Sequence, residues 1–401
     1  MSVAGMDWAT AISYETSFEK AVLECVGDVA DRLGPGPVSL ALAFLTPHFA
    51  ARYSHLHELL GRSLGPEALI GCSAGGVIGG GEEAEHTPAV TLVAACLPDV
   101  RITPFRVGGS LPDLDGPPEA WERLIGARAA DEPQFVLLAD PFSGRPEALL
   151  AGLDYAFPDS SKVGGLASGG TSPGSVALFL GEKIFTDGVV GVALSGDVTV
   201  DTVVAQGCRP VGPLLQVTAC RGNFLHELDG RPALEVLREI LTELDERDRR
   251  LAGTALFVGF LMDEFREEPQ TGDFLVRNLM GVDPNHGAIA VGENLQQGMR
   301  VQFHLRDAAT SAEDLHALLL GYEKGLPPNT SPAGALLFSC LGRGQHLYGQ
   351  PNFDTSVFHE HLGDVPVGGF FCNGEIGPVG GSTFLHGYTS SFGLFRPRVT
   401  A

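Results

Sequence analysis

Three short glycine-rich clusters constrain the fold of this chain more than any other feature of its sequence. Each lies at a similar distance from the start of an apolar run that is typical of a buried strand, with a helical segment between them. The clusters are GCSAGG (71–76), GLASGG (165–170) and GFFCNG (369–374), and the runs begin at Val38, Phe135 and Ala335. The shared order and spacing predict an internal repeat of strand, helix, strand, glycine turn and strand.

The repeat favours an α+β fold of two related lobes, each with mixed β-sheets and outer helices, and αββα-like layering is one arrangement that would satisfy it. A helix is expected over 16–33, because Thr16 and Glu19 have capping-box spacing and apolar residues recur at helical intervals. Several turn signals between 205 and 230 mark the best boundary. We therefore predict an N-terminal domain over 1–222 and a C-terminal domain over 223–401.

The composition of the chain indicates which classes of partner it can bind and in which compartment it is expected. Glycine supplies 53 of 401 residues, about twice the usual share of roughly 7%, and the net charge is −23. Such an acidic chain repels phosphate backbones and anionic lipid, so neither nucleic acid nor a membrane surface is an expected partner. Seven scattered cysteines without a Cys-x-x-Cys pair favour a reducing compartment. With no signal-peptide pattern and no apolar stretch of about 20 residues, a cytoplasmic protein without membrane insertion is expected.

The densest group of polar residues is C-terminal. Glycines there permit close backbone approach around a carboxylate, an amide and a thiol, and an arginine, an imidazole and a hydroxyl are expected at the same end of the sheet. This set could recognise a small zwitterion or acid. A buried ion pair with hydrogen-bonded turns explains the pattern equally well. The candidate ligand-binding residues are Arg343, Cys372, Asn373, Gly374, Glu375, His386 and Thr389, with Ser73 from the first glycine turn.

Ser73 lies in a Gly-x-Ser-x-Gly sequence, the pattern of a nucleophile elbow. An elbow needs a helix after the serine, and the glycine-rich VIGGGEE is a poor helix former. A turn serine is therefore favoured over a serine hydrolase, which stays as an alternative with Ser73 as the nucleophile; Asp354 and His386 follow it in the order a triad requires, as residues of these types would in most chains of this length.

The histidines give no metal-site pattern. The pairs His55/His57 and His359/His361 lie two residues apart on expected helices, so their side chains point to different faces. No metal is expected. Haem needs one well-placed histidine, which leaves His286 or His386 as an open alternative.

The order of these motifs resembles the FIST family (F-box and intracellular signal transduction). KVGGLASGG with DGVVGVALSG is similar to its N-terminal domain, and FSCLGRG with GGFFCNGEIGPVGG is similar to its C-terminal domain. The resemblance runs from about residue 35 to 395. It implies a sensory protein that binds a small ligand, with amino acids or their relatives suggested, and one branch that resembles a haem-based gas sensor.

This chain lacks the F-box, kinase and cyclase domains that accompany some members, so a separate signalling protein is the implied output partner. The family has no agreed catalytic residues, and Arg343, Asn373, Glu375 and His386 match its recurring polar positions by inference. We expect a stand-alone cytoplasmic sensor of an amino-acid-like metabolite, with binding favoured over catalysis. A haem-binding gas sensor and a serine hydrolase are the alternatives.

Overall fold

The computed structural model describes residues 5–34, 36–143, 145–327 and 330–398. The chain divides into two units, each of which is described by itself. Unit 1 contains residues up to Val204, Leu318–Leu385 and the segment from Thr389 onward, and unit 2 contains Ala205–Ala317 and His386–Tyr388. The two-unit organisation and the mixture of sheets and helices agree with the expected fold class. The predicted domain boundary at 222/223 stays a prediction.

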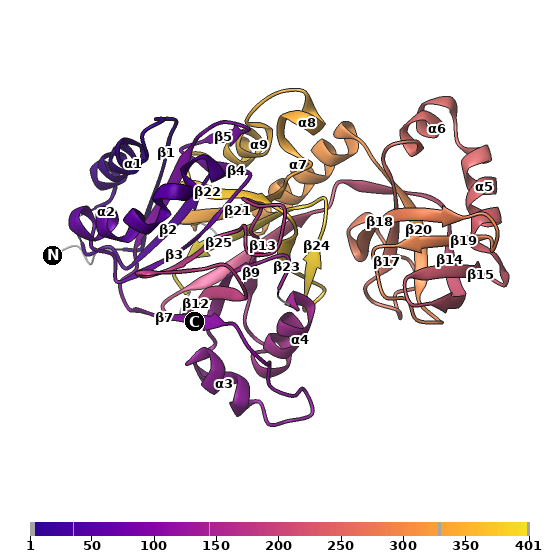
Figure 1. The fold of residues 1–401 in the computed structure, drawn as a ribbon, viewed down its shortest axis with the longest axis horizontal. Coiled ribbons are helices and arrows are strands. Elements are labelled where there is room, and N and C mark those ends of the chain that lie inside the picture. Colours follow the sequence, from indigo (N-terminus) through magenta and orange to yellow (C-terminus); the bar gives the residue numbers. More distant parts are fainter. Residues whose placement is uncertain (1–4, 35, 144, 328–329, 399–401) are drawn as a thin grey trace. The chain divides into compact units, whose positions relative to one another are not determined.

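Unit 1 is built around three sheets, each of six strands among the described residues (Figure 1). The first has the order β1 (Asp7–Ser13), β6 (Val90–Cys96), β2 (Leu40–Leu45), β3 (Ala68–Ser73), β10 (Leu178–Leu180), β11 (Lys183–Phe185). The second has β7 (Val100–Val107), β12 (Val189–Gly196), β8 (Gln134–Ala139), β9 (Lys162–Leu166), β23 (Glu375–Val379), β24 (Ser382–His386). The third has β13 (Thr199–Ala205), β25 (Ser390–Arg396), β21 (Gly334–Cys340), β22 (Val367–Cys372), β4 (Gly76–Gly79), β5 (Glu82–Glu85).

The same strand order recurs in the three sheets. A parallel pair, β2–β3, β8–β9 or β21–β22, lies in the middle, and an antiparallel strand flanks its first member. The second member pairs with a hairpin that follows the parallel pair of a different sheet: β10–β11 joins β3, β23–β24 joins β9, and β4–β5 joins β22. This exchange of hairpins ties the three sheets together through backbone hydrogen bonds.

One glycine in each parallel pair lies directly against the neighbouring strand. A Cβ added to Gly71, Gly164 or Gly369 would lie 2.1, 1.9 or 1.8 Å from the carbonyl oxygen of the facing residue. The strand register therefore makes Gly164, and not Gly165, the equivalent of Gly71 and Gly369. The sequence alignment of the second cluster is wrong by one residue, because two adjacent glycines made both registers look alike.

The three sheets face one another across a shared apolar core, and helices cover their outer faces. Leu42, Leu138 and Phe338, one from the first strand of each parallel pair, belong to the same buried cluster. On the first sheet lie α1 (Phe18–Arg32), η1 (Pro47–His55) and α2 (Leu56–Ser63), and on the second lie α3 (Glu119–Ile125) and α4 (Pro146–Ala156). The rings of Phe358 and Phe392, 5.5 Å apart, pack α9 (Phe353–Leu362) on the third sheet.

Two details near the N-terminus differ from expectation. Helix α1 begins at Phe18 with Ser17 as its N-cap, and no side-chain cap bond forms there, so the predicted Thr16–Glu19 capping box is absent. Strand β1 was not expected at all. It pairs antiparallel with β6 from Asp7 to Ser13, a partner about 80 positions along the chain that local periodicity does not reveal.

Unit 2 contains one sheet in the order β14 (Cys208–Arg221), β20 (Arg300–Arg306), β17 (Leu256–Leu261), β18 (Phe274–Asp283), β19 (Ala288–Val291), β15 (Phe224–Leu228), β16 (Arg231–Pro232). An additional β14–β15 pairing closes the sheet on itself. Helix α5 (Ala233–Glu243) contributes Leu234 and Leu237 to the core, which also contains Phe303 of β20. Helix α6 (Glu246–Ala252) follows it, and α7 (Ala308–Gly325) begins in this unit.

Candidate functional site

The three glycine turns of unit 1 contact one another through backbone groups and one serine. Ser168 Oγ accepts a hydrogen bond from the Gly75 backbone N–H at 2.9 Å and donates to the Phe371 carbonyl. The backbone N–H of Asn373 donates to the Leu166 carbonyl at 3.1 Å. Because the glycines of the three turns have no side chains, the backbones of the turns can approach one another this closely. Ser168 was not among the residues predicted from the sequence.

Ser73 is buried in the first of these turns. Its Oγ accepts a hydrogen bond from the Ala177 backbone N–H at 2.8 Å, and its carbonyl accepts from the N–H of Gly169 at 3.0 Å. The segment after it forms strand β4 and no helix, in agreement with its poor helix-forming composition, whereas an elbow requires a helix there. The Ser73 hydroxyl therefore stabilises the turn by accepting a backbone hydrogen bond.

Arg343 forms a buried ion pair with a residue that the ligand prediction left out, Asp354 at the start of α9. Both side chains are at most 1% exposed, and Nε and Nη2 each lie 2.9 Å from a carboxylate oxygen of Asp354. The hydroxyls of Ser339 and Ser390 also donate to that carboxylate. Burial alone would raise the pKa of Asp354, but the Arg343 guanidinium holds it below its ordinary value. The guanidinium is thus occupied by a partner from its own chain.

Glu375 and Thr389 are brought together in the same unit. Thr389 Oγ1 donates to Glu375 Oε2 at 2.8 Å, and both residues are buried. Cys372, also buried, has a thiol pKa raised well above its ordinary value by burial. Asn373 is exposed, and its Nδ2 donates to the Ala167 carbonyl at 3.3 Å. Gly374 packs against Leu385 and Leu166.

The two histidines proposed for haem belong to unit 2. His386 is buried, whereas His286 is exposed and has its Nδ1 2.8 Å from a carboxylate oxygen of Asp283. His386 is therefore not placed relative to the predicted cluster of unit 1. The haem alternative stays a prediction.

Glu83 of β5 is another buried carboxyl residue that was not predicted from the sequence. Its Oε1 accepts a hydrogen bond from the Thr355 backbone N–H at 2.8 Å, in the first turn of α9, where Asn352 makes no side-chain cap bond. A carboxyl group from the exchanged hairpin thus caps a helix of the third sheet. Burial, followed by the nearby Asp354 carboxylate, raises the pKa of Glu83 from 4.5 to about 8.

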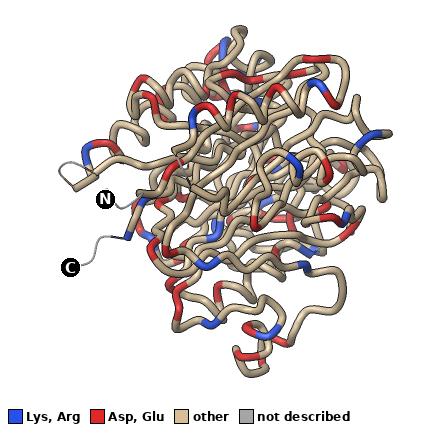
Figure 2. The backbone as a smooth tube through the Cα atoms, turned by 90° about the vertical axis from the view of Figure 1, so that its left-hand side faces the viewer, with Lys and Arg blue, Asp and Glu red and all other residues tan. Residues whose placement is uncertain are grey.

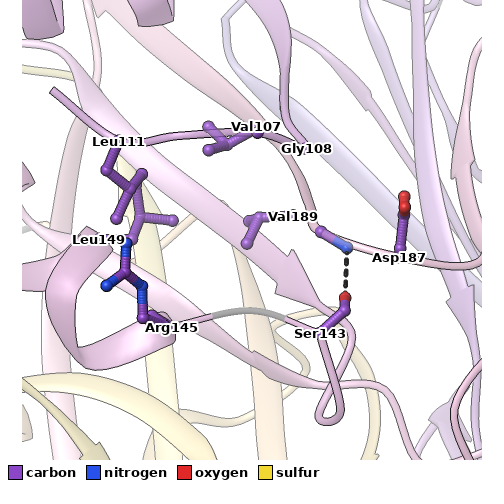
Figure 3. A pocket seen from close by; sticks show the side chains of 10 residues that line it. Val107, Gly108, Leu111, Ser143, Arg145, Leu149, Asp187 and Val189 are labelled. Atoms are coloured by element: carbon purple, nitrogen blue, oxygen red, sulfur yellow. Dashed lines mark hydrogen bonds between the residues drawn. The ribbon is translucent and has the colours of Figure 1, made fainter.

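Unit 1 also contains a pocket of about 250 Å³ at the end of β8 and the start of α4 (Figure 3). Its lining residues are Val107, Gly108, Gly109, Leu111, Ser143, Arg145, Leu149, Asp187, Gly188 and Val189. They come from three segments far apart in sequence; Asp187, Gly188 and Val189 begin the family-like DGVVGVALSG, but nothing in the sequence connected that segment with the other two. The pocket walls combine apolar side chains with a few polar groups, a make-up that suits a small-molecule site, and the same unit also holds a larger cavity of about 710 Å³ around Met6, Pro37 and Leu97.

The charges at this pocket are arranged in two groups. Arg145 is exposed and stands beside Leu149 and Leu111, and Asp187 and Ser143 lie at the other side (Figure 3). Asp187 is already paired with Arg106, whose guanidinium lies against Gly108 of the wall. Ser143 is neutral and the charges of Asp187 and Arg106 cancel. Arg145 therefore leaves the pocket with one net positive charge. Acidic positions outnumber basic ones along the chain, so this local balance is the reverse of the overall one (Figure 2).

No helix among the described residues is both long and apolar enough to cross a membrane.

Known proteins with similar sequences cover nearly the whole chain. Uncharacterized protein Rv0628c of Mycobacterium tuberculosis is 36% identical over 387 residues, which is 96% of this chain and 98% of that protein. Uncharacterized protein Mb0898c of Mycobacterium bovis is 36% identical over 379 residues, or 94% of this chain and 95% of that one. F-box/LRR-repeat protein At5g63520 of Arabidopsis thaliana is 25% identical over 67% of this chain and 58% of its own length.

Among solved structures, cyanuric acid hydrolase from A. caulinodans covers 98% of this chain and 100% of its own, with 8% identity and a TM-score of 0.32. That similarity is too low to carry an argument. Family models are more informative: the FIST N domain matches residues 39–231 and the FIST C domain matches residues 233–378. Both domains are present in order over most of the sequence, and the chain belongs to the FIST family.

Proposed function

We propose that this protein is a small-ligand sensor that holds its ligand in the pocket beside α4 and signals through a separate protein. FIST domains are associated with small-ligand sensing and signal transduction. The observation that carries the proposal for this chain is the pocket itself, which combines apolar walls, a hydroxyl and an arginine without an ion-pair partner among the described residues in about 250 Å³. An amino-acid-sized molecule fits such a volume. The cytoplasm is the proposed location, on the evidence of the scattered cysteines.

A route from the pocket to the glycine turns supports a sensory role. The loop that carries Ser143 and Arg145 follows β8 directly, and the last residue of β8, Ala139, accepts a hydrogen bond from the Ala167 N–H at 2.8 Å. Ala167 in turn accepts from Asn373 of the third turn. A ligand that reorganises the loop therefore acts on the contact between turns. We also propose that the three sheets arose by internal duplication.

The predicted C-terminal residues have a different place in this proposal. Arg343, Glu375 and Thr389 hold buried partners from their own chain, which supports a part in the scaffold of the turns. Direct ligand contact by these residues, together with Asn373, is a separate proposal, and Glu375→Gln tests it. If that substitution removes ligand binding while the pocket variants retain it, the site lies at the turns.

A thermal-shift screen over amino acids, organic acids and amines tests the proposed function. A ligand at 100 times its Kd stabilises the folded state by about 2.7 kcal/mol, so a clear shift is expected for at least one class. Leu111→Glu places a charge in the pocket and should remove the shift. Leu114→Glu is the matched control, since Leu114 is 45% exposed and does not line the pocket. A shift that survives in Leu111→Glu, or the absence of any shift across the screen, contradicts the proposal.

A further inference from the structure

The geometry of the same pocket points to its ligand class: we infer that it selects an aliphatic monocarboxylate over the corresponding amino acid or amine. This inference rests on the proposed function, because it names what the sensor binds. It follows from the balance of charge, the arrangement of the walls and the volume of the pocket.

The charge balance at the pocket calls for one negative group on the ligand. Arg145 has no ion-pair partner among the described residues, and its exposed guanidinium stands at one side of the cavity (Figure 3). A guanidinium offers two parallel N–H donors that match a carboxylate. Helix α4 begins at the next residue, Pro146, and the N-cap Arg145 supplies no side-chain cap. The partial positive charge of the helix N-terminus adds to that of Arg145.

The same balance disfavours a positive group on the ligand. Asp187 is the acidic side chain in the lining, and it is paired with Arg106. The guanidinium of Arg106 is also held over the Phe185 ring, 4.2 Å from its centroid, so the pair is fixed from both sides. An ammonium group entering the pocket would lose water and gain no carboxylate of its own. The neighbouring carboxylates Asp140 and Glu147 do not line the pocket.

The walls between the two charged groups are aliphatic. Val107 and Val189 lie in the middle of the view, with Leu111 and Leu149 beside Arg145 (Figure 3). The two valines come from neighbouring strands and are directly paired in the register of β7 and β12. Directly paired residues of antiparallel strands lie on the same face of the sheet, so the two valines offer adjacent apolar side chains to a branched hydrocarbon chain. Each CH₂ that leaves water there should tighten binding about fourfold, until the volume of about 250 Å³ is filled.

Isothermal titration of the full chain at pH 7 tests the inference with three probes of similar shape: isocaproate, leucine and isoamylamine. We expect isocaproate to bind, leucine to bind at least about tenfold more weakly, and isoamylamine to give no heat, because the acidic side chain in the lining, Asp187, is already paired with Arg106. In a series from isocaproate to butyrate, affinity should fall about fourfold with each carbon removed.

Arg145→Gln should weaken isocaproate binding by about 10- to 100-fold, as expected for loss of a charge-assisted bidentate contact. Arg123→Gln is the matched control: Arg123 is an exposed arginine on α3, outside the pocket, and its loss should leave affinity unchanged. Both side chains are exposed, so both variants should fold.

The outcomes separate this inference from the proposed function. Leucine binding as tightly as isocaproate, or unchanged isocaproate affinity in Arg145→Gln, overturns the inference. If isocaproate fails to bind while another compound gives a shift that Leu111→Glu removes, the ligand class is wrong and the sensor proposal stands. If no compound in the screen binds, both are overturned.

Discussion

Neutralising Glu83 should change how the stability of unit 1 depends on pH. Its side chain is 6% exposed, with Oε1 on the Thr355 N–H and the Asp354 carboxylate nearby, and its pKa is raised from 4.5 to about 8 by burial first and by Asp354 second. Between those two values the folded chain holds a proton that the unfolded chain has released. Raising the pH therefore withdraws stability, by about 1.4 kcal/mol per pH unit, as the pH rises from about 4.5 through about 8.

Glu83→Gln mimics the protonated side chain and keeps an oxygen for the Thr355 N–H. Relative to this variant, the wild-type free energy of unfolding should fall by about 3 kcal/mol between pH 5.5 and 7.5. Urea unfolding at three pH values across that interval measures the difference, and other titrating groups cancel in it. Glu182→Gln, at the exposed turn of the β10–β11 hairpin, is the control and should run parallel to the wild type. Parallel curves for wild type and Glu83→Gln would refute the assignment of a buried, proton-holding carboxyl.

Three further substitutions test the packing and the polar network. Gly369→Ala should destabilise unit 1 by at least about 3 kcal/mol in urea unfolding, because the added Cβ would lie 1.8 Å from a carbonyl oxygen. The control is Gly109→Ala, whose Cβ would have no atom within 4 Å and which should change stability little. Equal effects of the two substitutions would contradict the strand register. Asp354→Ala should lower the free energy of unfolding by about 3–5 kcal/mol, since it leaves the charge of Arg343 buried without its carboxylate partner. The double variant Arg343→Met, Asp354→Leu should recover much of that loss. No recovery would argue against charge burial as the cause. Burial lowers the pKa of His304 from 6.5 to about 4, so this residue stays neutral in folded unit 2. The free energy of unfolding should therefore fall by about 1.4 kcal/mol per pH unit as the pH drops from 6.5 toward 4. In unfolding measured across that pH range, His304→Gln should remove this slope.

Although the parallel pairing itself was not predicted, the first strand of each parallel pair could be predicted because its signal is local. Each lies on a continuous apolar run, and the glycine that meets the neighbouring backbone must lack a side chain, so it is visible in the sequence. The exchange of hairpins could not be predicted. Strands such as β4 and β5 pair equally well with any exposed strand edge, and the choice of β22 depends on how the three sheets assemble.

The candidate site shows the same limit. Arg343 was visible as an arginine after a strand, but its partner Asp354 lies beyond an intervening short helix, α8 (Gly344–Tyr348), and was not connected with it. The pocket could not be predicted because Leu111, Arg145 and Asp187 come from three separate segments, which no sequence signal connected with one another. Only the closing of the second sheet and the start of α4 beside it bring these side chains together.

The central claim is that the pocket beside α4 holds a small ligand. A crystal structure of the protein soaked with isocaproate tests it most directly. We expect density for the ligand between Arg145 and Val189, with the carboxylate on the guanidinium and the hydrocarbon chain on Val107 and Leu149. An empty pocket at a concentration that saturates binding in solution, or ligand density at the glycine turns instead, would contradict it.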